Sequence, residues 1–191
     1  MSPQVDKRAT LDILQTLDSY LEKYERKFPI YLMGGSALIL RDVQEDSKDA
    51  DFITNSNGYL ALGEAVERLE KERGIRIDYF KDGRIISYRY EDYYLRAEKV
   101  RGLRLKHLDV YVLDFVNIIL TKALSGRESD MQKILELKRR GITAPRDELE
   151  RRFQRVVPNR GKEKEIKERF ENFLQAYYAD QKSKGFKTSS S

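Results

Sequence analysis

The chain has 191 residues, of which 36% are charged and 40% hydrophobic, and its formal net charge is +5. It has no cysteine, which excludes a disulfide framework, a thiolate metal site and a thiol nucleophile. Its length suits one domain, or one domain with a helical appendage. Because no apolar run approaches the roughly 20 residues of a membrane span and the N-terminal segment lacks the apolar core of a signal peptide, we expect a cytoplasmic protein with no membrane partner.

The first part of the chain alternates between helical and strand patterns. Leucines spaced three and four residues apart predict an amphipathic helix that ends before Pro29. Further on, a KDG segment predicts a hairpin-type turn between two strands. The predicted helices are 8–27, 36–43 and 58–74, and the predicted strands are 30–33, 49–54, 75–80, 84–90 and 107–113.

The second part is predicted to be mostly helical. We expect helices over 114–124, 128–141, 146–156 and 161–180, followed by a polar, disordered tail over 181–191. A mixed part followed by a helical part indicates an α+β domain over 1–113 and a C-terminal helical subdomain over 114–180.

A glycine pair, Gly34 and Gly35, stands between a predicted strand and a predicted helix. Glycines allow a sharp turn and a close approach to the backbone, and the helix start offers free N–H groups to an anion. Ser36 adds a hydroxyl donor, so the segment can bind phosphate. The alternative is a tight turn capped by Ser36 with no ligand.

Two carboxylates follow on one strand. Side chains two residues apart on a strand share a face, so Asp49 and Asp51 project together. Like charges this close repel unless a cation or a proton lies between them, and paired carboxylates suit Mg²⁺. The alternative is a solvated strand end.

Gly34-Gly35-Ser36 followed by Asp49-Ala50-Asp51 resembles the nucleotidyltransferase superfamily related to DNA polymerase beta. The resemblance implies a small mixed β-sheet with flanking helices. It also implies a third carboxylate on the strand after the next helix. Asp78 is the favoured residue, and Asp109 is the alternative. Either can instead be a paired surface carboxylate.

Residues 108–137 resemble a stretch of small stand-alone nucleotidyltransferases, including toxin-type members, so that the likeness spans about 30–140. It implies that Lys122 and Arg127 contact nucleotide phosphates and that Asp130 orients Arg127. The alternative is a local ion pair between Arg127 and Asp130.

The resemblance implies a reaction in which a nucleoside monophosphate passes from a nucleoside triphosphate to a hydroxyl of RNA, protein or a small molecule. Asp49, Asp51 and Asp78 would hold two Mg²⁺ ions, and a cognate protein partner would fit a toxin–antitoxin component. Two alternatives stay open: a catalytically degenerate binding or partner protein, and a basic RNA-binding protein whose aspartates are incidental.

Two further features permit an RNA acceptor but do not require one. The helical half is rich in lysine and arginine interleaved with glutamate, which is more typical of a solvated face with paired charges. Tyrosines at 88, 90, 93 and 94 can stack on bases, but a position at the core edge or an interface is favoured.

Overall fold

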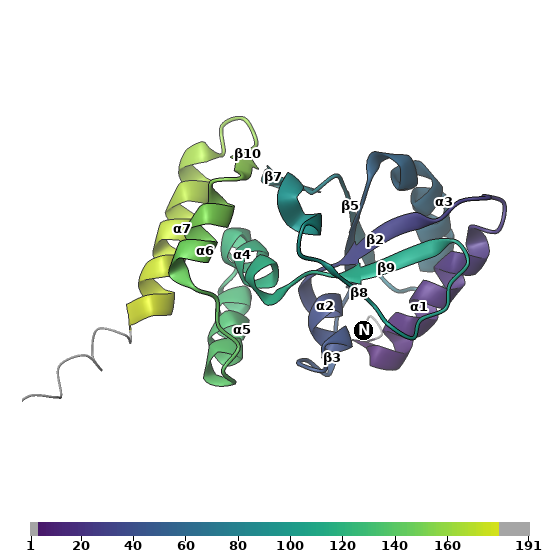
Figure 1. Cartoon of the computed structure of the whole chain (residues 1–191), viewed down its shortest axis with the longest axis horizontal. Helices are drawn as coiled ribbons and strands as arrows, with labels where there is room; N and C mark the ends of the chain where they lie inside the picture. Colours follow the sequence, from purple (N-terminus) through teal and green to yellow (C-terminus); the bar gives the residue numbers. More distant parts are fainter. Residues whose placement is uncertain (1–3, 180–191) are drawn as a thin grey trace, which may run out of the picture.

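The computed structural model describes residues 4–179. Strands and helices are interspersed up to β9, and helices dominate after it (Figure 1). The elements in chain order are β1 (Val5–Asp6), α1 (Lys7–Tyr20), β2 (Phe28–Leu32), α2 (Gly34–Leu40), β3 (Asp46–Ser47), β4 (Ala50–Thr54), α3 (Ser56–Arg73), β5 (Ile77–Lys81), β6 (Arg84–Ile85), β7 (Tyr88–Tyr90), the 3₁₀ helix η1 (Glu91–Tyr94), β8 (Glu98–Lys99), β9 (Leu108–Val112), α4 (Phe115–Ser125), α5 (Glu128–Arg139), α6 (Arg146–Phe153), β10 (Val156–Pro158) and α7 (Glu163–Tyr178).

The central sheet is mixed, with the strand order β5-β4-β2-β9-β8. β2 pairs antiparallel with β4 and parallel with β9, while β4 pairs parallel with β5. On β2, Phe28, Ile30 and Leu32 are buried and alternate with partly exposed residues, as expected for a strand with one face on the core. The predicted α+β class with a small mixed sheet and flanking helices is confirmed.

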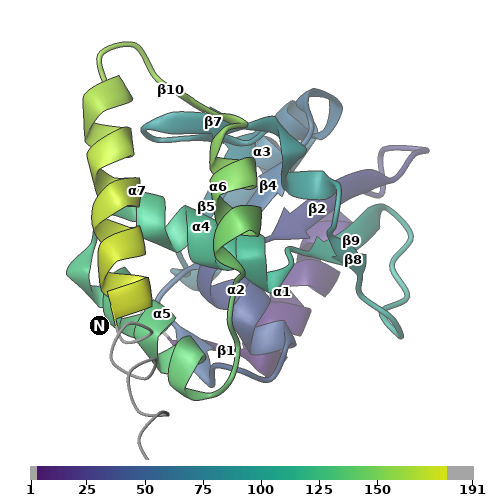
Figure 2. The ribbon, with the colours of Figure 1, turned by 60° about the vertical axis from the view of Figure 1, so that its left-hand side comes forward.

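The hairpin predicted around the KDG turn is wrong, because the strand after the turn does not pair with the strand before it, β5. Asp82 and Gly83 do form a turn, both at positive φ, as a two-residue hairpin turn requires. β7, however, pairs with β6 and with β10, a strand that the sequence did not predict, so that these three strands form a separate small sheet (Figure 2). A segment of the first part of the chain is therefore hydrogen-bonded to the helical part.

Most other predicted elements occur with shifted ends. The first helix stops at Tyr20 rather than at residue 27, and α6 stops at Phe153 because β10 begins three residues later. The short strands β1, β3 and β8 were not predicted. The domain division at 113 stays a prediction, and the predicted tail at 181–191 lies outside the described residues.

A buried arginine joins α6 to the start of α4. Arg152 is 8% exposed, and its guanidinium donates to both carboxylate oxygens of Asp114, each at 2.7 Å. It also donates to Glu148 at 2.8 Å and to the side-chain oxygen of Asn117 at 2.6 Å. Asp114 in turn caps α4 by accepting from the Asn117 amide. One side chain thus holds the two helices together.

We expect Arg152→Ala to lower the free energy of unfolding by about 3 kcal/mol, because it leaves the partly buried Asp114 carboxylate without its arginine. Urea denaturation followed by circular dichroism measures this change. Arg146→Ala is the matched control: it removes an exposed pair with Glu150 on the same helix and should cost about 0.5 kcal/mol or less. Equal costs for the two variants would contradict the assigned role of Arg152.

Candidate metal and nucleotide site

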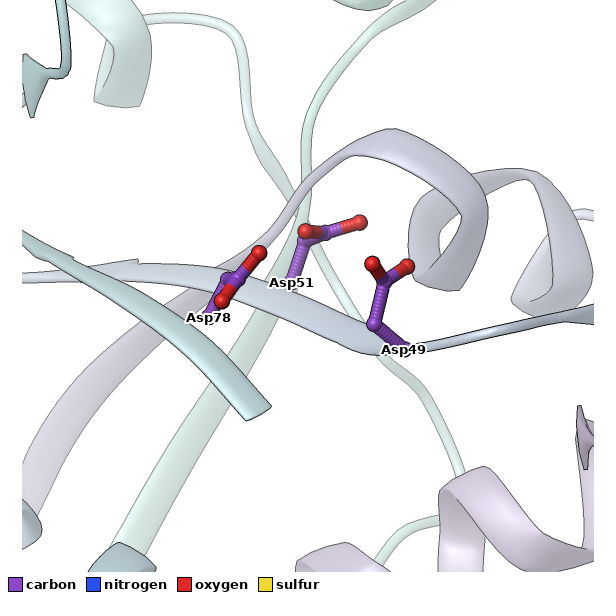
Figure 3. Close-up of side chains that lie close together, drawn as sticks. All are labelled: Asp49, Asp51 and Asp78. Carbon is purple, nitrogen blue, oxygen red and sulfur yellow. The ribbon is translucent and has the colours of Figure 1, made fainter. Parts of the chain in front are cut away.

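Three carboxylates meet at one end of the central sheet. The parallel register of β4 and β5 pairs Asp51 with Asp78, and Asp49 precedes β4 by one residue. One carboxylate oxygen from each of Asp49, Asp51 and Asp78 lies within 4.8 Å of the others. Figure 3 shows the three carboxyl groups on the same side of the strands, with Asp51 between the other two. We call this group the carboxylate triad.

The triad stores electrostatic repulsion. Burial raises the pKa of Asp51 to about 7, the charges of Asp49 and Asp78 act in the same direction, and Lys122 and a hydrogen bond from the Gly35 amide offset part of the effect. Arg76 compensates Asp78 by donating to both of its oxygens, at 3.0 and 3.1 Å. Ser47 donates to Asp49 at 3.2 Å. The centre of the triad is thus short of positive charge.

The glycine turn packs directly against the triad. Gly34 has φ +55°, and a Cβ there would lie 2.4 Å from a carboxylate oxygen of Asp51. A Cβ on Gly35 would lie 2.4 Å from the Ser47 hydroxyl. Ser36 is fully buried, and its hydroxyl accepts from the Asp51 amide at 3.0 Å, so this side chain ties α2 to β4. Phosphate binding by the three residues stays a prediction.

Asp109, the alternative third carboxylate, lies elsewhere. It pairs in register with Pro29, at the opposite end of β2 from the glycine turn, and it accepts from Lys99 at 2.7 Å. It is absent from the triad, where Asp78 takes the third place. The first strand after α3, rather than the later one, supplies the third carboxylate because β5 adjoins β4 while β9 lies beyond β2.

Lys122 and Asp130 form a buried pair on the helical side. The Lys122 ammonium donates to Asp130 at 2.6 Å, and the Ser125 hydroxyl donates to the other carboxylate oxygen at 2.7 Å. Burial acts to raise the pKa of Asp130, but the charge and hydrogen bond of Lys122 outweigh it and the net shift is downward. Asp130 is thus hydrogen-bonded to Lys122 and Ser125, and its role in orienting Arg127 stays a prediction.

A cleft of about 660 Å³ runs between the triad and the helical side. Its walls include the glycine turn, the triad, Lys122, Arg127 and Asp130. The residues predicted as site residues, apart from the buried Ser36 and the distant Asp109, thus line one cavity. Lys48, Arg127 and Lys133 also line it, and their side chains form no ion pair within residues 4–179.

Three residues at this site were not predicted from the sequence. Arg76, which pairs with Asp78 without lining the cleft, stands two residues before that carboxylate, a spacing that puts two side chains on one face of an extended backbone. Ser47 and Tyr88 were not assigned to the site, because their proximity depends on the short strands β3 and β7, whose sequences carry no strong periodicity.

A family model described as a nucleotidyltransferase of unknown function, DUF6036, matches residues 8–175. The chain therefore belongs to this family, and through it to the nucleotidyltransferase superfamily that its motifs resemble. No curated protein matches the sequence.

Two solved structures are similar to the model. One is a nucleotidyltransferase-like antigenic protein from Paracoccidioides brasiliensis, with a TM-score of 0.50 and 15% identity over 95% of this chain and 94% of that one. The other is the antibiotic-resistance factor ANT(2'')-Ia, with a TM-score of 0.41 and 12% identity over 92% of this chain and 95% of that one. At these identities the likeness to the first structure supports the fold alone.

Within the described part of the chain, no helix is both long and apolar enough to cross a membrane. The cytoplasmic location stays a prediction.

The raised pKa of Asp51 makes the stability of the metal-free protein depend on pH. The folded state binds the proton more tightly than the unfolded state, so this contribution is complete below the ordinary value of 3.8 and is lost as pH rises towards about 7. We expect unfolding free energy to fall by roughly 2–4 kcal/mol across this range in EDTA. Mg²⁺ should restore the loss above pH 7, as thermal denaturation measures.

Asp51→Asn and Asp109→Asn form the matched pair for this measurement. Asp51→Asn removes both the pH slope and the response to Mg²⁺, whereas Asp109→Asn, on another part of the sheet, keeps both. An unchanged slope in Asp51→Asn would show that the repulsion lies elsewhere.

Gly34→Ala should displace the Asp51 carboxylate, since the new Cβ overlaps its oxygen. We expect Mn²⁺ affinity, measured by isothermal titration calorimetry, to fall at least about tenfold, as for other changes that misorient a ligand. Gly102→Ala is the control, because Gly102 also has a positive φ but nothing lies within 4 Å of its added Cβ. Equal affinities in the two variants would refute the role of Gly34.

Proposed function

We propose that this protein is a metal-dependent nucleotidyltransferase that moves a nucleoside monophosphate from a nucleoside triphosphate to a hydroxyl acceptor. The observation that carries the proposal is the convergence of Asp49, Asp51 and Asp78 beside the glycine turn in one cleft. Membership of a nucleotidyltransferase family supports it. A degenerate scaffold would have no need to keep three mutually repelling carboxylates together.

The donor set fits a divalent cation such as Mg²⁺. All three side chains offer oxygen ligands, which hard cations prefer, and their spacing allows one ion to be shared. Burial, and after it the charges of Asp49 and Asp78, raise the pKa of Asp51, so a cation bound here would stabilise its ionised form. When bound, two Mg²⁺ ions would neutralise charge on the phosphates and lower the pKa of the attacking hydroxyl.

The side chains of the protein would position the reactants. The backbone of the glycine turn and the cations Lys48 and Lys133 would receive the triphosphate, while Lys122, held by Asp130, adds positive charge to the helical wall. In the transfer, the acceptor oxygen bonds to the α-phosphorus and the bond to the bridging oxygen breaks. Pyrophosphate then leaves, and the hydroxyl proton passes to solvent.

The surface of the helical half lends little support to the simple RNA-binding alternative. Many of its basic residues pair with glutamates of the same helix, as Lys164 does with Glu168 and Lys167 with Glu171. Such a face carries little unbalanced charge for a polyanion. A cognate protein partner and a toxin–antitoxin role stay proposals that the resemblance to toxin-type members suggests.

The test is a transfer assay with the purified protein, Mg²⁺, each α-labelled nucleoside triphosphate, and RNA, peptide and small alcohol acceptors in parallel. We expect label transfer together with pyrophosphate release. Combined Asp49→Asn and Asp51→Asn should abolish both, whereas Asp109→Asn should retain them. Absence of transfer and of Mg²⁺-dependent nucleotide binding would refute the enzyme proposal.

A further inference from the structure

The two ends of the cleft differ in chemistry. Around Asp49 and the glycine turn the walls are polar, with Gln4, Ser47, Lys48 and Lys133. Along the chain after Asp78 the lining residues Phe80, Ile85 and Ile86 are apolar. Phe80 shares the strand face of Asp78, and two residues of β-strand separate their backbones by about 7 Å. The apolar end of the cleft thus begins two residues along the strand from Asp78 of the carboxylate triad.

Ile86 is exposed yet firmly held. Its side chain is 78% exposed and lines the cleft together with those of Ile85 and Phe80. Its backbone oxygen accepts from the Asn159 side chain at 2.9 Å, and the oxygen of the following Ser87 accepts from the Asn159 amide at 3.0 Å. The exposed side chain is therefore presented on a fixed backbone rather than on a loose turn.

Within residues 4–179, the Tyr88 hydroxyl is a fully buried side-chain oxygen that has no hydrogen-bond partner. The residue is 2% exposed and lines the cleft, where the charges of Asp130 and Arg169, which also line it, act on its hydroxyl. A buried hydroxyl without a partner is costly, so its retention calls for a ligand that satisfies it. Burial raises the pKa of this phenol, so it stays protonated and can donate.

On the basis of the transfer reaction proposed above, we propose that the apolar end of the cleft binds the base of the nucleoside triphosphate. Phe80, Ile85 and Ile86 form the surface on which the base lies, and the Tyr88 hydroxyl bonds to its polar edge. The triphosphate then extends past the triad to the cation-bearing end. Tyr88 is thereby a specificity-determining residue, because the polar edge is what distinguishes one base from another.

The test measures equilibrium affinity for ATP, GTP, CTP, UTP and inorganic tripolyphosphate by calorimetry in Mg²⁺. The wild type should bind nucleotides more tightly than tripolyphosphate, with differences among the four bases. Ile86→Ser should weaken all four nucleotides about tenfold and leave tripolyphosphate unchanged. Leu60→Ser is the matched control, since Leu60 is 80% exposed on α3 and does not line the cleft.

Tyr88→Phe separates base recognition from a structural role. Loss of an unpartnered hydroxyl should raise the melting temperature of the free protein by about 2–4 °C, while the affinity differences among the four nucleotides shrink about 3–10-fold. Tyr94→Phe, at a tyrosine that is 51% exposed outside the cleft, should change neither quantity. A fall in tripolyphosphate affinity, or a changed KM for the acceptor with unchanged nucleotide affinity, overturns the inference.

These binding measurements test the base site separately from the transfer assay, which tests the proposed function. Normal transfer by an Ile86→Ser variant with unaltered nucleotide affinity would leave the proposed function standing and remove the base site. Base-dependent binding without any transfer would do the reverse.

Discussion

The site depends on the parallel register of β4 and β5, which sets Asp51 beside Asp78 against their mutual repulsion. Neighbouring strands lie about 4.8 Å apart, so no relaxation of the side chains alone can separate the two charges fully. The fold imposes the contact, and hydrophobic neighbours such as Phe52 and Ile53 in the same strand provide the stabilisation that offsets it. The groups that surround the triad compensate for this repulsion or leave room for the carboxylates.

The surrounding groups act in different ways. Arg76, on the solvent side, pairs with the Asp78 carboxylate, and the buried Ser36 hydroxyl accepts a hydrogen bond from the Asp51 backbone amide. Gly34 leaves the room that the Asp51 carboxylate occupies. On the opposite wall, Lys122 faces the triad but is already committed to Asp130, so it contributes charge without closing the cleft. The arrangement keeps the carboxylates assembled and still accessible to a cation.

The main strands, the glycine turn and the proximity of the three carboxylates could be predicted from the sequence, because each rests on local rules. Asp49 and Asp51 share a face through the two-residue period of a strand, and Asp78 follows from the order of strand and helix. The pairing of β7 with β10 and the position of Tyr88 were not predicted. They depend on segments of two or three residues whose partners lie far along the chain, and no local period marks them. The pair between Lys122 and Asp130 was not predicted either, because the two residues lie on different helices, α4 and α5.

The pairing of β7 with β10 also bears on how the protein is made. Tyr90 pairs with Val156, so the strand that carries Tyr88 gains its second neighbour only when most of the polypeptide has been synthesised. Contacts between segments so distant along the chain close slowly, because their loop entropy is lost before the contact is rewarded. On the ribosome, the carboxylates would thus come together well before the wall facing them is complete, and a nascent chain would hold its anionic cluster in an open, unfinished groove.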